Sequence, residues 1–135
     1  MNIQVAREQL AAAVRERGSG AYVLTVTEDG TPHVVHARVE WDGAELVAEV
    51  GARTAENASA RPRISLLYPI RSETDYSLIV DGVACVEAAG DGRRLRVTPA
   101  RGVFHRPGPS PDPASSCTDD CIPIFTSLDA ARSAP

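Results

Sequence analysis

The segment Gly51-Ala-Arg-Thr-Ala-Glu-Asn57 joins a glycine turn to the start of a short predicted helix. The first N–H groups of a helix lack partners within it, and with the helix dipole they favour an anion. Arg53 adds a guanidinium fork for phosphate oxygens, and Thr54 adds a hydroxyl donor. The segment therefore fits a cradle for one phosphate group. It equally fits a plain helix start, in which Thr54 is the N-cap of a helix through Ala60 and Arg53 is solvated.

Three histidines are candidate proton-transfer groups or metal ligands. His33 and His36 are three residues apart on a predicted strand, so they point to opposite faces and cannot easily share a metal. His36 shares the polar face of that strand with Arg38 and Glu40, and this face could meet solvent, a ligand or another subunit. The third, His105, follows the last predicted strand.

The cysteines give a weaker signal. Cys117 and Cys121 form a C-x-x-x-C pair, which with His105 could bind zinc or a cluster, or could form a disulfide or remain two thiols. The pair lacks a second ligand pair of familiar spacing, so we assign no metal. Cys85 lies in the middle of a predicted strand and is expected to be a small buried residue.

All 14 basic residues are arginines, and several of them make the last predicted strand basic. These are Arg93, Arg94, Arg96, Arg101 and Arg106. They fit either a solvated edge that discourages association between sheets or a surface for an anionic cofactor. The absence of lysine excludes a Schiff-base lysine, a lysine nucleophile and a phosphate-loop lysine.

The composition narrows the classes of protein. A chain of 135 residues is typical of one domain, and 43% hydrophobic and 24% charged residues are ordinary for a globular protein. The net charge of −4 argues against nucleic-acid binding. No apolar run has the length of a membrane span and no signal peptide is evident, so we expect a cytoplasmic protein that does not enter a membrane.

The periodicity indicates a mainly β fold with two helices. Helices are expected over residues 2–17 and 54–60. Strands are expected over residues 22–27, 33–41, 44–50, 63–68, 77–88 and 93–104. Asp81-Gly82 indicates either a hairpin turn or a bulge within one long strand. The pattern predicts a small antiparallel barrel or sandwich over residues 1–105, a Pro/Ser-rich linker over 106–116 and a tail over 117–135.

Five segments, in this order, resemble the pyridoxamine 5′-phosphate oxidase-like split-barrel family. They are residues 30–43, 45–47, 51–57, 61–67 and 77–84. The resemblance covers roughly residues 5–105 and implies a six-stranded antiparallel split β-barrel, with an N-terminal helix and a short helix between the third and fourth strands. It also implies a homodimer, and one bulged strand at Asp81-Gly82 in place of the hairpin.

The resemblance further implies that FMN, or alternatively a deazaflavin coenzyme, binds to the barrel. The phosphate end is expected at Arg53, Thr54 and Asn57. The ring is expected along the second and third strands, at Val35, His36, Ala37, Val47 and Ala48. The partner subunit is expected to contribute near Ser77.

Two departures from the family pattern affect the phosphate site. The family often has a lysine where Thr54 stands and an arginine where Val35 stands. The phosphate would then be held by Arg53, the Thr54 hydroxyl and backbone donors. The C-terminal segment that pyridoxine phosphate oxidases use for their substrate is not recognisable, so that activity is not expected.

The expected function is hydride transfer between the bound cofactor and a small organic substrate. No catalytic side chain is assigned, because the cofactor would supply this chemistry. The alternative is a non-catalytic split-barrel protein, either a flavin carrier or sensor or a scaffold with a vacant site.

Overall fold

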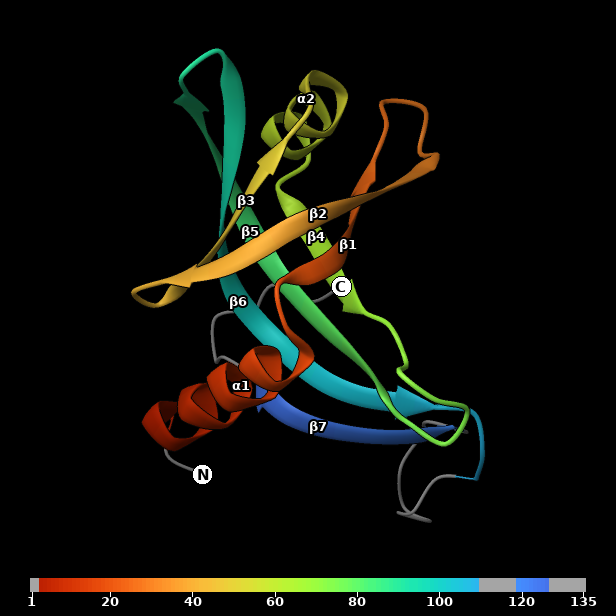
Figure 1. The fold of residues 1–135 in the computed structure, drawn as a ribbon. Helices are drawn as coiled ribbons and strands as arrows, with labels where there is room; N and C mark the ends of the chain where they lie inside the picture. Colours follow the sequence, from red (N-terminus) through yellow and green to blue (C-terminus); the bar gives the residue numbers. More distant parts are fainter. Residues whose placement is uncertain (1–2, 110–118, 127–135) are drawn as a thin grey trace.

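The computed structural model describes residues 3–109 and 119–126 (Figure 1). Its elements are α1 (Ile3–Arg17), β1 (Gly20–Val26), β2 (Pro32–Asp42), β3 (Glu45–Val50), α2 (Ala52–Ala60), β4 (Arg63–Tyr68), β5 (Ser77–Ala89), β6 (Gly92–Arg106) and β7 (Asp120–Thr126). The strands form one antiparallel sheet in the order β3-β2-β1-β4-β5-β6-β7. Because β3 also pairs with β6, the first six strands close into a barrel, which confirms the predicted fold.

The barrel is filled by the inward-facing side chains of alternating residues. Leu46 of β3, Leu66 of β4 and Leu78 of β5 are completely buried, as are Leu95 and Val97 of β6. This alternation follows from the period of two along a strand, which turns every second side chain to the interior.

The two helices lie at opposite ends of the barrel (Figure 1). α1 lies beside β6 and β7, and Leu10 and Val14 on its apolar stripe join the core. The helix approaches β6 closely at Gly102, where an added Cβ would lie 2.8 Å from Leu10 Cδ1. α2 follows β3 directly and ends at Ala60, two residues before Pro62, which cannot continue a helix.

A bulge interrupts the pairing of β5 with β6 between Asp81 and Gly82. β5 continues through this point as one strand, so the bulge is confirmed and the hairpin is excluded. A Cβ at Gly82 would lie 2.6 Å from Val97 Cγ1 and 2.7 Å from the carbonyl oxygen of Thr98. A glycine is therefore needed here because the neighbouring strand comes too close for a side chain.

Two features differ from the expectations. Cys85 is exposed rather than buried, because the strand alternation buries its neighbour Ala84 and turns Cys85 outward. Residues 120–126 of the expected tail form β7, which pairs along β6 and buries Phe125. The sequence does not predict this strand, because Pro123 stands at its centre.

The rest of the expected linker and tail lies outside the described residues, apart from residues 106–109 and 119. Neither of the two described helices has the length and apolar character that crossing a membrane requires.

Candidate functional site

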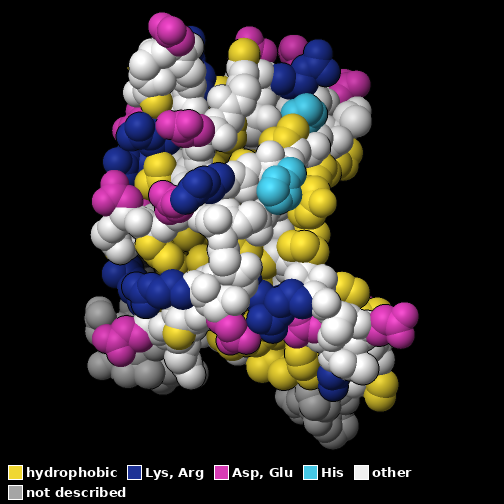
Figure 2. Space-filling model, viewed as in Figure 1, with side chains coloured by type: hydrophobic (Ala, Val, Ile, Leu, Met, Phe, Trp, Pro, Cys, Tyr) yellow, Lys and Arg dark blue, Asp and Glu magenta, His cyan; other side chains and the backbone are white. Residues whose placement is uncertain are grey.

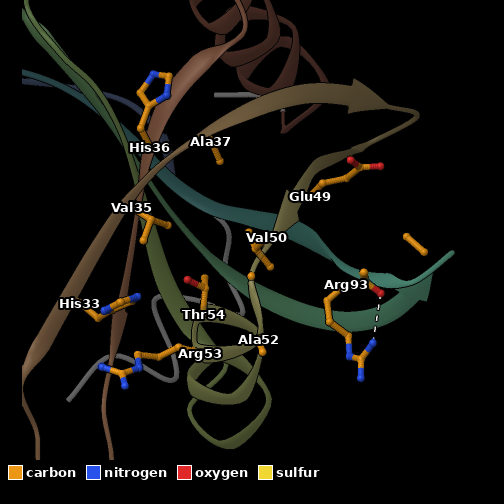
Figure 3. Close-up of a pocket in the computed structure, with 13 residues that line it drawn as sticks. His33, Val35, His36, Ala37, Glu49, Val50, Ala52, Arg53, Thr54 and Arg93 are labelled. Atoms are coloured by element: carbon orange, nitrogen blue, oxygen red, sulfur yellow. Dashed lines mark hydrogen bonds between the residues drawn. The ribbon is translucent and has the colours of Figure 1, made fainter.

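A cleft of about 640 Å³ opens at the end of the barrel that carries α2 (Figure 3). Its walls come from β2, from the end of β3 and the start of α2, and from the turn between β5 and β6. The lining residues are His33, Val35, His36, Ala37, Glu49, Val50, Gly51, Ala52, Arg53, Thr54, Ala89, Gly92 and Arg93. Of the nine predicted site residues, five line this cleft: Val35, His36, Ala37, Arg53 and Thr54.

The N-terminus of α2 faces the cleft without a side-chain cap. Gly51 is the N-cap residue in an extended conformation, and its carbonyl accepts the first helical hydrogen bond, from Ala55 N at 3.0 Å. The expectation that Thr54 is the N-cap is therefore wrong, because the helix begins at Ala52 and Thr54 lies inside its first turn. The N–H groups that precede Ala55 lack acceptors within the helix, so this end of α2 can receive an anion.

Thr54 and Arg53 place polar groups in the cleft. Thr54 is only 2% exposed, yet its hydroxyl has no hydrogen-bond partner in the described part of the chain. Figure 3 shows this hydroxyl pointing toward Val35, and it shows the exposed Arg53 extending toward His33. Among residues 3–109 and 119–126, no carboxylate pairs with Arg53. Both side chains are therefore available to a ligand.

On the β2 wall of the cleft, Val35 and Ala37 form an apolar surface beside His33. Val35 and Ala37 turn toward the cleft, whereas the His36 ring points to the other side of the strand (Figure 3). That ring makes an edge contact with Tyr22, with centroids 5.2 Å apart. The prediction that His33 and His36 lie on opposite faces is confirmed, and His36 contributes only to the rim of the cleft.

The other four predicted residues lie outside this cleft. Asn57 lies on the buried face of α2, and its Nδ2 donates a hydrogen bond to Thr25 Oγ1 at 3.1 Å. Ala48 is 1% exposed in the core, and Val47 lines a smaller hollow on the outer surface. Ser77 is the first residue of β5, whereas the cleft lies at the other end of that strand. The Ser77 hydroxyl donates a hydrogen bond to the carbonyl oxygen of His105 at 3.0 Å.

Two charged residues of the cleft, Glu49 and Arg93, are absent from the predicted site. Arg93 belongs to the basic run of the last strand, so the sequence carried a signal for an anion-binding role. The sequence could not show which arginine of that run reaches the start of α2. The pairing of Val50 with Arg93 decides this, because it brings the start of β6 beside the residue that precedes Gly51.

The structure offers no metal centre within its described residues, where no three His, Cys, Asp or Glu side chains are grouped for one. His105 lies opposite Cys121 in the pairing of β6 with β7, and its Nε2 lies 3.2 Å from Asp119 Oδ2. Cys117 lies outside the described residues, so the proposed Cys117–Cys121 pair is not described.

Comparison with known proteins identifies relatives and a common fold. No family model matches the chain. Uncharacterized proteins of Mycobacterium bovis and Mycobacterium tuberculosis are each 35% identical to it over 130 residues, covering 85% of this chain and 91% of theirs.

Solved structures share the fold at lower identity. A putative pyridoxamine 5′-phosphate oxidase from Listeria innocua is 16% identical with a TM-score of 0.62, covering 73% of this chain and 96% of its own. An F420 reductase is 19% identical with a TM-score of 0.57, covering 67% and 93%. The heme storage protein HutZ of Vibrio cholerae is 16% identical with a TM-score of 0.54, covering 73% and 91%. The chain therefore belongs to one family with the two mycobacterial proteins, and it has the split-barrel fold of the pyridoxamine 5′-phosphate oxidase-like superfamily.

Proposed function

We propose that the protein is a flavin- or deazaflavin-dependent oxidoreductase that uses the cleft beside α2 as its cofactor site. One observation carries the proposal: an apolar wall on β2 meets an uncapped helix N-terminus that presents Arg53 and the unpartnered Thr54 hydroxyl. A planar ring with a phosphate-bearing side chain fits such a combination of surfaces. FMN is the first candidate, and a deazaflavin coenzyme is the second.

Each surface would have a distinct role. The amides at the start of α2, Arg53 and Thr54 would bind the phosphate, while Val35 and Ala37 would hold the ring and exclude water from one of its faces. When bound, the cofactor supplies the hydride chemistry, so the cleft needs no side-chain base. The substrate would be a small organic molecule that reaches the open side of the ring.

We also propose that the protein is a homodimer formed through the outer face of β1, β2, β4 and β5. Tyr22, Val34 and Val83 on this face are 38–51% exposed. Figure 2 shows hydrophobic side chains along the right-hand edge of the molecule, next to two histidines. Tyr22 lies opposite His36, which is on the rim of the cleft, so a partner on this face would adjoin the cofactor site.

A spectroscopic titration tests the cofactor. We expect FMN, or the deazaflavin F420, to bind the purified protein with a micromolar or lower dissociation constant and a changed visible spectrum. Arg53→Gln should weaken binding about tenfold, because a charge-assisted contact to phosphate is lost. Arg7→Gln is the matched control, since Arg7 is exposed on α1 at the other end of the barrel. Failure of both cofactors to bind would refute the proposal.

Heme binding is the second candidate function, because His33 lines the cleft and neighbours with this fold are named for heme storage. A hemin titration distinguishes it from flavin binding. A Soret band that is lost in His33→Ala and kept in His36→Ala would favour heme, since the His36 ring points to the other side of β2. An unperturbed hemin spectrum in the wild-type protein would exclude it.

A further inference from the structure

Arg93 lies beside the N-terminus of α2, although it is distant from it in the sequence. It is the second residue of β6 and pairs in register with Val50, which directly precedes the N-cap residue Gly51. Residues that are directly opposite on paired strands project to the same face, so Arg93 and Val50 point to the same side. Both residues line the cleft. Figure 3 shows the Arg93 and Arg53 side chains extending to opposite sides of Ala52.

The positive charge of Arg93 is not neutralised within the described structure. Its guanidinium donates only to the carbonyl oxygen of the adjacent Gly92, at 3.1 Å. The neighbouring Arg94 and Arg96 both bind Glu87, with N–O distances of 3.4 and 3.0 Å. Arg93 therefore differs from the rest of the basic run, because its charge remains available for a ligand.

The cleft as a whole favours an anion. The first turn of α2 contains no acidic residue, and Arg53 has no carboxylate partner among the described residues. Glu49 is the single acidic residue in the described lining of the cleft. It pairs in register with Arg94, one position along the strands from the pair formed by Val50 and Arg93. Two guanidinium groups and the helix N-terminus thus outweigh one carboxylate.

We propose that Arg93 is the second cation of an anion site at the start of α2, so that a phosphate monoester seated there is held between Arg53 and Arg93. A phosphate monoester carries a charge of about −1.5 to −2 near neutral pH, so one arginine leaves it only partly neutralised. The second arginine completes the charge match at a site where Thr54 offers only a neutral hydroxyl donor. The phosphate's identity as part of a cofactor rests on the proposed function, but the anion site itself does not.

Inorganic phosphate tests the site without any flavin. In ¹H–¹⁵N spectra at low ionic strength, we expect phosphate to shift the amide signals of Ala52, Arg53 and Thr54 in a saturable way. The dissociation constant should rise about fivefold or more in Arg93→Gln, because a charged hydrogen bond to the anion is removed. Arg94→Gln is the control: it removes a charge next to Arg93 on the same strand, and it should change the constant by less than about twofold because Arg94 already binds Glu87.

A comparison of FMN with riboflavin then links the site to the cofactor. Arg93→Gln should weaken FMN binding about tenfold and leave binding of riboflavin, which lacks the phosphate, unchanged. Phosphate binding that is absent in the wild type, unaffected by Arg93→Gln, or weakened equally by Arg94→Gln overturns the inference. Phosphate binding that requires Arg93 while no flavin, deazaflavin or heme binds supports the inference and refutes the proposed function.

Discussion

The buried amide of Asn57 on α2 donates a hydrogen bond to the hydroxyl of Thr25 on β1, across 3.1 Å. The two residues are 5% and 1% exposed, so water does not replace this bond. The contact attaches the helix that starts at the candidate site to the wall of the barrel. Asn57 therefore supports the site from beneath and does not reach into the cleft.

Asn57→Ala should destabilise the fold by about 1–3 kcal/mol, because it leaves the Thr25 hydroxyl buried without its donor and opens a small space. Urea denaturation followed by circular dichroism measures the change. Glu56→Ala is the matched control, since Glu56 is the exposed neighbour on the same helix and should change stability by less than about 0.5 kcal/mol. Equal effects of the two substitutions would contradict the role assigned to Asn57.

Thr54→Val should separate ligand binding from stability. Valine keeps the shape of threonine but removes the hydroxyl that faces the cleft, so the free energy of unfolding should change by less than about 1 kcal/mol. FMN binding should weaken several-fold while riboflavin binding is unchanged. Thr54→Ser, which keeps the hydroxyl, should retain the preference for FMN, and a loss as large as that of Thr54→Val would argue against the hydroxyl contact.

Val34→Glu should convert the proposed dimer into monomers. Val34 is 51% exposed on the apolar outer face, and a carboxylate placed there would have to be desolvated in the interface. Size-exclusion chromatography with light scattering gives the molar mass. Ile122→Glu is the control, because Ile122 is 40% exposed on β7, outside the barrel strands, and its substitution should leave the mass unchanged. A wild-type protein that is already monomeric at micromolar concentration would refute the dimer.

Asp120 attaches β7 to the barrel, and protonation of its carboxylate at low pH should weaken this attachment. Its Oδ2 accepts hydrogen bonds from Tyr76 at 2.6 Å and from Arg106 at 2.7 Å. The Tyr76 hydroxyl, followed by Arg106, lowers the pKa of this carboxyl below its ordinary value of 3.8. A group whose pKa is lowered by folding stabilises the folded state above its unfolded pKa, and this contribution is lost as the pH falls through the folded pKa.

The melting temperature should therefore fall as the pH drops below about 4, and Asp120→Asn should reduce the slope of that fall. The measurement is a series of thermal melts between pH 3 and pH 7. Glu73→Gln is the control, because Glu73 is exposed in the loop before β5 and should leave the slope unchanged. An identical pH dependence in wild type and Asp120→Asn would show that Asp120 does not contribute to acid sensitivity.

The strands and turns of the barrel were largely predictable, because the information that specifies them is local. The alternation around Val39, the tight turns and the glycine–helix junction at Gly51 each lie within a few residues of sequence. The family pattern resolved the ambiguity at Asp81-Gly82, where the spacing alone fitted both a hairpin and a bulge. The structure adds the reason for the glycine, which is the close approach of Val97 and Thr98 from the neighbouring strand.

The sequence by itself determined the barrel strands, the two helices and the placement of Arg53 and Thr54 at the start of one helix, since periodicity and turn residues act over short distances. Tertiary structure alone decided that Asn57 bonds to Thr25, that β7 joins the sheet and that Arg93 reaches the cleft. Each of these depends on which distant segments become neighbours when β3 and β6 close the barrel or β7 pairs with β6. Strand pairing is set by the packing of the whole core, and no local pattern in the chain encodes it.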